Sequence, residues 1–218
     1  MPFIATFIQT LATLLNPRSW PLMIRVALTA FALGILFIVC VSTALAYTHI
    51  FQDTRLDMVA DWIGGLGASV IAWLLLPALI PLAAGFYEER LIQLTAPHTH
   101  IAPHPFWPNL ASDLRFMGVS ALLNIVCMPL FFIPVIGWLG YIVLNGYLLG
   151  REFFNTSAGY FIGKPQAETL RRQYVIGVWL AGAGLALLAL VPLLNMFVPC
   201  IGVIWLTHMY RRIAQANT

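Results

Sequence analysis

The sequence predicts an all-α integral membrane protein with two long transmembrane helices, two partly penetrating helical hairpins and an N-terminal amphipathic helix. Hydrophobic residues make up 61% of the chain and charged residues only 9%, whereas soluble domains carry roughly 25% charged residues. Four apolar stretches are each long enough to enter a bilayer, and prolines and glycines interrupt the last two near their middles. We therefore expect one membrane domain over residues 1–218.

The first element is an amphipathic helix over residues 1–16. Its apolar residues recur at spacings of three and four, with threonines and a glutamine between them, and they are Phe3, Ile4, Phe7, Ile8, Leu11, Leu14 and Leu15. A stripe of this length is short for a span, so the helix is expected to lie in the membrane interface or to pack under the bundle. A basic segment and a cleavage site are both lacking here, so we expect the mature protein to retain this helix.

Two spanning helices are predicted over residues 20–51 and 62–87. The first apolar run is broken only near its start by Arg25, whose long side chain can reach the head groups. The second run contains Pro77 and Pro81, which should kink its helix. The polar connector between the two runs carries one arginine and three aspartates.

The third and fourth runs, residues 117–150 and 175–210, are predicted to be helical hairpins. Each has roughly 35 residues, which would give roughly 50 Å of continuous helix against a bilayer core of about 30 Å. Both runs contain the pattern Pro-x-Ile-Gly, and the residues expected at the two tips are Pro129, Pro134, Gly137, Pro192, Asn195, Pro199 and Gly202. Broken half-helices of paired units face the solute in several transporter folds. Two full short spans per run remain an alternative.

The positions of the basic residues favour hairpins over single crossings. If every run crossed once, with the N-terminus inside, the loop holding Arg151, Lys164, Arg171 and Arg172 would lie outside. Hairpins instead place every basic residue except Arg55 on the cytoplasmic side, as the positive-inside rule requires. Both chain termini are then cytoplasmic.

Several function classes find no support in the sequence. The motifs of serine hydrolases, zinc proteases and phosphate-binding loops are absent, so we expect neither an enzyme nor a cofactor. His98, His100 and His104 lie in a proline-rich loop without a carboxylate or cysteine at metal-ligand spacing, so no metal site is predicted. A net charge of +3 with no basic stretch also excludes nucleic acid as a partner.

Two groups of charged residues are candidates for function. Arg18 and Ser19 precede a long helix, whose free N–H groups and positive dipole end favour an anion; anchoring of Arg18 to lipid phosphate is the alternative. The second group consists of charged residues at predicted helix ends near the cytoplasmic level, expected to form an ion-pair network, either structural or lining a vestibule. Its members are Glu88, Glu89, Arg90, Arg151 and Glu152.

The chain resembles the CysZ-type sulfate permeases, whose superfamily includes the etoposide-induced membrane proteins. The resemblance rests on the order of elements and on three motifs: Leu148-Leu-Gly-Arg151-Glu152-Phe153-Phe154, Pro192-Leu-Leu-Asn195 with Pro199, and Thr207-His208 followed by Arg211-Arg212. It implies an oligomeric bacterial inner-membrane protein that takes up sulfate for cysteine synthesis.

The resemblance also implies an anion site. The family's site resembles a Gly-Leu-Arg-Arg stretch before the first long helix, and the matching stretch here is Asn16-Pro-Arg18-Ser19-Trp20, which keeps one arginine.

Few ionisable residues lie deep in the apolar runs, which favours a passive path over a coupled pump. A non-transporting membrane scaffold or assembly factor is the alternative function.

Overall fold

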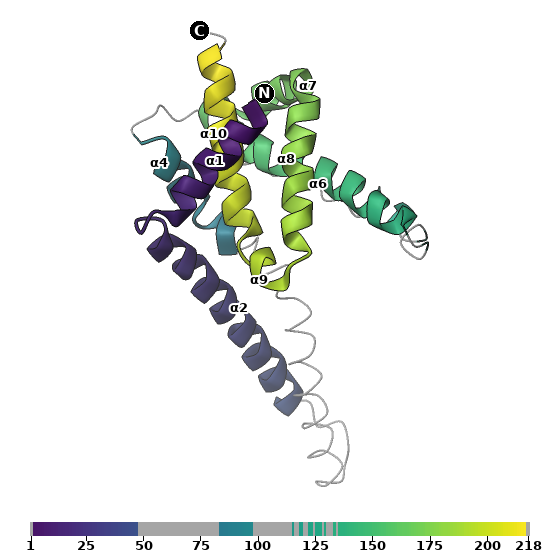
Figure 1. Ribbon diagram of the computed structural model, residues 1–218. Coiled ribbons are helices and arrows are strands. Elements are labelled where there is room, and N and C mark those ends of the chain that lie inside the picture. Colours follow the sequence, from purple (N-terminus) through teal and green to yellow (C-terminus); the bar gives the residue numbers. More distant parts are fainter. Residues whose placement is uncertain are drawn as a thin grey trace. The chain divides into compact units, whose positions relative to one another are not determined.

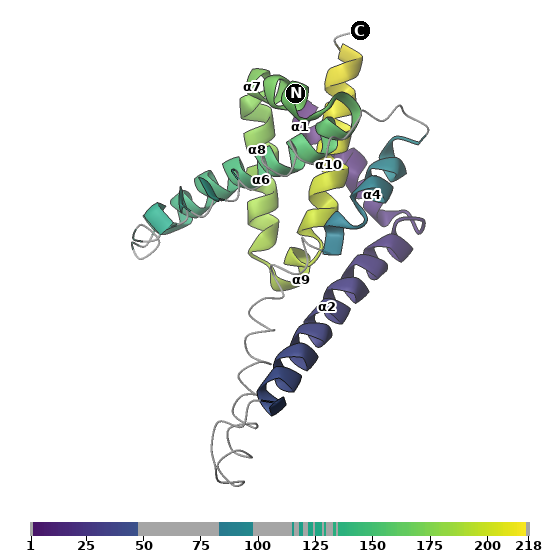
Figure 2. The same cartoon turned by 180° about the vertical axis from the view of Figure 1, so that it is seen from behind.

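The computed structural model describes residues 2–47, 83–97 and 136–216, together with positions 115, 118, 119, 122, 123, 125–127, 129, 133 and 135. Every regular element among these residues is a helix, which confirms the all-α prediction. The chain divides into two compact units, Met1–Trp20 with Glu88–Thr218, and Pro21–Tyr87. The helices are shown from two sides (Figures 1 and 2).

Helix α2 (Trp20–Tyr47) makes up most of the described part of the Pro21–Tyr87 unit. Large apolar side chains lie exposed along it, as expected for a helix in lipid, and they include Ile24, Leu28, Phe31, Ile35, Leu36 and Val39. The Thr29 and Tyr87 hydroxyls lie 3.0 Å apart, so the chain before Glu88 reaches the first turns of α2. Most of the predicted second span, with Pro77 and Pro81, and the connector lie outside the described residues.

One helix among the described residues is long and apolar enough to cross a membrane, at Trp20–Cys40. A second candidate exists if the bent pair of α7 (Lys164–Gln173) and α8 (Val175–Ala189), which meet at 98°, is counted as one span. Both candidates are identified by length and composition alone.

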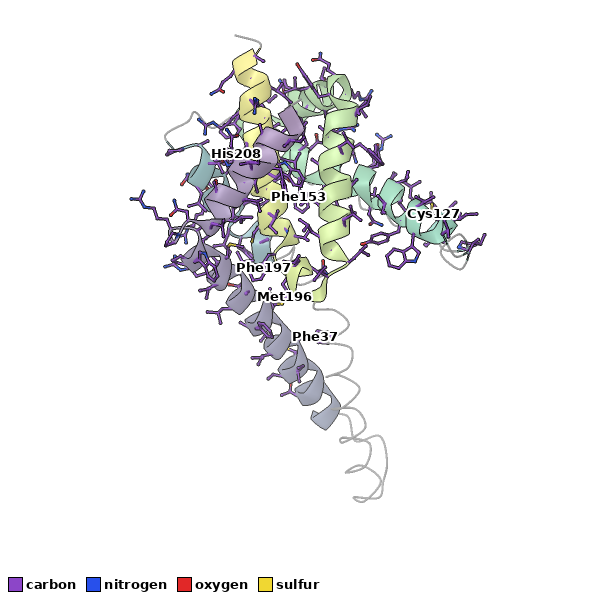
Figure 3. All side chains as sticks on the ribbon, viewed as in Figure 1. Phe37, Cys127, Phe153, Met196, Phe197 and His208 are labelled. Atoms are coloured by element: carbon purple, nitrogen blue, oxygen red, sulfur yellow. The ribbon has the colours of Figure 1, made fainter. Side chains whose placement is uncertain are left out.

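The predicted second hairpin is formed by α8, the single-turn α9 (Pro192–Asn195) and α10 (Val198–Ala216). The chain reverses through α9, so that α10 runs back along α8 (Figure 1). Pro192 opens α9, and Pro199 lies in the first turn of α10, where a missing N–H leaves no hydrogen bond unmade. Met196 and Phe197 lie at this reversal (Figure 3).

Gly202, by contrast, lies inside α10 rather than at the reversal. A Cβ atom added there would lie 2.5 Å from the Phe153 ring, so this glycine admits an aromatic side chain of a neighbouring helix. The Pro-x-Ile-Gly pattern therefore marks the start of α10 and not the turn itself.

Helix α6 (Ile136–Ile162) continues well beyond the predicted end of the first hairpin at residue 150. Val135, directly before the helix, has a positive φ of 69°, which a β-branched residue rarely adopts, and Gly137 lies buried in the first turn. Pro129 lies in a short helical turn, while Pro134 is outside the described residues. The helix stops only at Gly163, with φ 82°.

Glycines bring α6 and α8 into close contact. A Cβ atom on Gly182 of α8 would lie 2.0 Å from the carbonyl oxygen of Gly146 and 2.5 Å from the amide nitrogen of Gly150, both on α6. Small residues that let backbones approach are typical of helix pairs in membranes. The buried core next to this contact includes Phe154, Leu185 and Trp205.

Helix α1 (Pro2–Leu15) is amphipathic as predicted, and it packs against α10 with its polar face. Thr6 and Thr10 are buried, the Trp205 indole donates to the Thr6 hydroxyl at 3.3 Å, and the Phe7 and Trp205 rings lie 5.0 Å apart. The opposite face carries the exposed apolar side chains Ile4, Ile8, Leu11 and Leu15. Such an outward apolar stripe is suited to lipid rather than to water.

Candidate functional site

The predicted anion site lies in a tight turn between α1 and α2. The Asn16 side-chain oxygen accepts from the Arg18 amide at 3.1 Å, so Asn16 closes the turn, and α2 begins only at Trp20. The side chains of Arg18 and Trp20 are exposed. Arg18 is thus available to an anion or to a lipid head group.

Ser19 faces the opposite way. Its hydroxyl is buried and lies 2.7 to 3.1 Å from the carbonyl oxygens of Thr13, Leu14 and Asn16, at the end of α1. A hydroxyl has a single proton, and here that proton serves carbonyls at a helix C-terminus, where the regular intrahelical partners end. The structure therefore separates Ser19 from Arg18 and gives the serine a capping role.

A carboxylate that is not among the residues predicted from the sequence, Glu168, is the centre of a charged cluster. Glu168 on α7 accepts from the Arg171 guanidinium through both oxygens, at 2.9 and 3.0 Å, and from the Asn155 amide at 2.9 Å. Arg172 and Arg151 lie at 3.2 and 3.5 Å from the same carboxylate. The paired Arg171 guanidinium holds the pKa of the Glu168 carboxyl at about 2, below its ordinary 4.5.

The cluster carries more positive than negative charge and joins two helices. Arg171 is buried and its guanidinium carbon also lies 5.6 Å from the centre of the Tyr147 ring, on α6. Arg151 and Asn155 belong to α6 as well, so one carboxylate ties α7 to α6 after the turn at Gly163. The Glu168-x-x-Arg171-Arg172 spacing, which puts all three on one helical face, is the signal that could have revealed it.

The predicted ion-pair network is divided between different partners. Arg151 pairs with Glu168, whereas Glu89 of α4 (Glu88–Thr95) accepts from the Tyr160 hydroxyl at 3.1 Å and from Gln93 at 3.2 Å. Glu88, Arg90 and Glu152 also have interaction partners. Helix α4 and the end of α6 therefore meet through Glu89.

The start of α6 lies near the end of α8. Gly137, Trp138 and Tyr141 at the start of α6 line a cavity of about 230 Å³ with Leu190, which follows α8. Asn195 ends α9, and its backbone N–H donates to the Val191 carbonyl at 2.8 Å. The lining of this cavity is mostly apolar, so the described residues here offer no polar path.

No group of three metal-ligating side chains occurs in the described part of the chain. His98, His100 and His104 lie outside it.

A family model described as "Sulfate transporter CysZ/Etoposide-induced protein 2.4" matches residues 6–199, which span α1 through the first residues of α10. Comparisons with curated proteins and with solved structures give no match for this chain. The matched region covers most of the sequence and includes the junction at Arg18, the Glu168 cluster and the α9 reversal. This chain belongs to the family of the sulfate transporter CysZ and the etoposide-induced protein 2.4.

Proposed function

We propose that this protein is a permease for sulfate or a related oxyanion in a bacterial inner membrane, where it supplies sulfur assimilation and cysteine synthesis. The match to the family over residues 6–199 is the observation that carries the proposal. The outward apolar faces of α1 and α2 support the membrane setting, because these side chains would be costly in water.

The proposed topology is multi-pass with both termini in the cytoplasm. Within the Met1–Trp20 and Glu88–Thr218 unit, α7 and the C-terminal end of α10 lie at one end, and α9 lies at the other (Figures 1 and 2). The basic residues Arg171, Arg172, Arg211 and Arg212 belong to the first end, and the reversal at the second carries none. A hairpin inserted from the cytoplasm would have this distribution of charge.

The proposed binding group is Arg18, at the start of α2. Its guanidinium is exposed, and the positive end of the α2 dipole lies beside it. A single arginine with few partners gives weak, reversible binding, which suits a passive path better than a tight-binding pump. We also expect a homo-oligomer, as the family resemblance implies.

Sulfate uptake into liposomes that hold only this purified protein tests the role of Arg18. We expect Arg18→Ala to lower the initial uptake rate at least about fivefold, because the variant loses one charge-assisted hydrogen bond to the anion. Arg115→Ala, which removes another exposed arginine, is the matched control and should keep the wild-type rate. Equal rates for wild type and Arg18→Ala would assign Arg18 to lipid anchoring instead.

A further inference from the structure

A second polar site lies between α1 and α10, away from the Arg18 turn. A cavity of about 550 Å³ opens there, a size typical of ligand pockets. Its lining comes from one face of each helix and consists of Gln9, Ala12, Thr13, His208, Arg211, Arg212 and Gln215. His208 lies where α1 passes α10 (Figure 3).

The lining residues are spaced for a shared helical face. Gln9 and Thr13 are four residues apart on α1, and His208, Arg211 or Arg212, and Gln215 follow at intervals of three and four on α10. The Thr13 hydroxyl lies 3.0 Å from His208 Nε2 and 2.9 Å from the Gln9 carbonyl oxygen. The hydroxyl proton can go to Gln9, so the hydroxyl oxygen accepts from Nε2–H and holds the imidazole in place.

The two arginines of this cavity have no carboxylate partner in the described part of the chain. Arg211 donates one N–H to the Thr95 carbonyl, which leaves most of its donors for a ligand. Arg212 makes no hydrogen bond or ion pair with any described residue, and none of the described residues that line the cavity is acidic. By contrast, Arg151, Arg171 and Arg172 all share Glu168.

We propose that the α1–α10 cavity binds a tetrahedral oxyanion, with Arg211 and Arg212 supplying the charge and Gln9 supplying a neutral donor. Adjacent guanidinium groups bind sulfate and phosphate through paired N–H donors. The volume exceeds that of one such anion and leaves room for its water or for the ester chain of a lipid. The apolar outer face of α1 places the cavity next to lipid, so a phospholipid head group and a free inorganic anion are both sources of this chemistry.

Binding to the full-length protein in a phosphate-free neutral detergent tests the site. Calorimetric titrations would use sodium sulfate, sodium phosphate and lysophosphatidylglycerol as separate probes, at constant ionic strength kept with sodium chloride. We expect at least one probe to bind and Arg212→Gln to weaken it about fivefold or more, as for a lost charge-assisted hydrogen bond. Binding of the lysophospholipid alone identifies a head-group site, and binding of the inorganic salts identifies a free-anion site.

Two further variants separate the cavity from general charge effects. Ala12→Phe fills the cavity without removing a charge and should weaken the same probe, whereas Arg115→Gln removes an exposed arginine elsewhere and should leave its affinity unchanged. Absence of binding by all three probes, or equal binding by wild type, Arg212→Gln and Ala12→Phe, would overturn the proposal. Binding is measured without flux, so a failed uptake assay leaves this test intact.

Discussion

Arg171 and Arg172 contact the same carboxylate from very different environments. The Arg171 side chain is 7% exposed and pairs with Glu168 through two hydrogen bonds, whereas the Arg172 side chain is 74% exposed. Buried pairs cost much to break because the remaining partner keeps its charge away from water, and exposed pairs contribute little.

We therefore expect Arg171→Gln to lower the free energy of unfolding by about 3 kcal/mol. The matched control Arg172→Gln should change it by less than about 1 kcal/mol. Thermal unfolding of the purified protein in detergent measures both. Equal destabilisation by the two variants would show that burial of Arg171 does not govern the cluster.

The same carboxylate predicts a loss of stability in acid. The folded-state pKa of Glu168 is about 2, below its ordinary 4.5, because Arg171 favours the charged form. A depressed pKa gives stability that is fully present above pH 4.5 and is lost as the pH falls towards 2. Melting temperatures recorded between pH 7 and pH 3 should fall less for Glu168→Gln than for wild type, and parallel curves would contradict this assignment.

The sequence shows which residues are charged or polar, but it does not predict which partners their side chains contact. Arg18 and Ser19 are neighbours in the chain, but the turn closed by Asn16 buries the serine against carbonyls of α1 and leaves the arginine exposed. Arg151 was predicted to join an ion-pair network, and its partner Glu168 lies beyond the turn at Gly163. The direction of a turn and the length of the helix before it decide these contacts, and neither follows from local composition.

At the scale of elements, the contact of α6 with α8 depends on glycines that admit backbone. An added Cβ on Gly182 would lie 2.0 Å from the Gly146 carbonyl oxygen. This clash is with backbone, which cannot move aside as a flexible side chain could. We expect Gly182→Ala to destabilise the protein by about 2 kcal/mol, the size of an overpacked contact. Gly85→Ala, where nothing lies within 4 Å, is the control and should be neutral or stabilising in the same melting assay.

The helical reversal at α9 was predictable because prolines and an asparagine interrupt an apolar run too long for one crossing. The function of the glycine in Pro-x-Ile-Gly was not, because Gly202 packs on Phe153 from a part of the chain about fifty residues away. Likewise, the α6 helix passes Arg151 and Glu152 without a break, since a polar pair does not stop a helix whose other face, including Phe154 and Ala158, stays in the core. Periodicity locates such elements, and tertiary packing sets their ends.

At the scale of the whole molecule, the hairpin topology predicts which residues reach each side of the membrane. In a cysteine-free background, Leu194→Cys lies at the exposed α9 reversal and Gln173→Cys lies at the polar end of α7. We expect a membrane-impermeant thiol reagent added outside cells to label neither residue, and inverted vesicles to expose Gln173→Cys. Full labelling of Leu194→Cys from outside would show that the α8–α10 pair crosses the bilayer completely.

The proposal that this chain conducts sulfate rests on its family and on the exposed apolar side chains of α1 and α2, and flux measures it most directly. Initial rates of sulfate uptake should be compared between liposomes that hold the purified protein and empty liposomes of the same lipid. We expect uptake well above that of the empty vesicles, without a requirement for a proton or sodium gradient. Uptake equal to that of empty vesicles, together with a stable partner that co-purifies with the protein, would contradict it and identify a membrane scaffold.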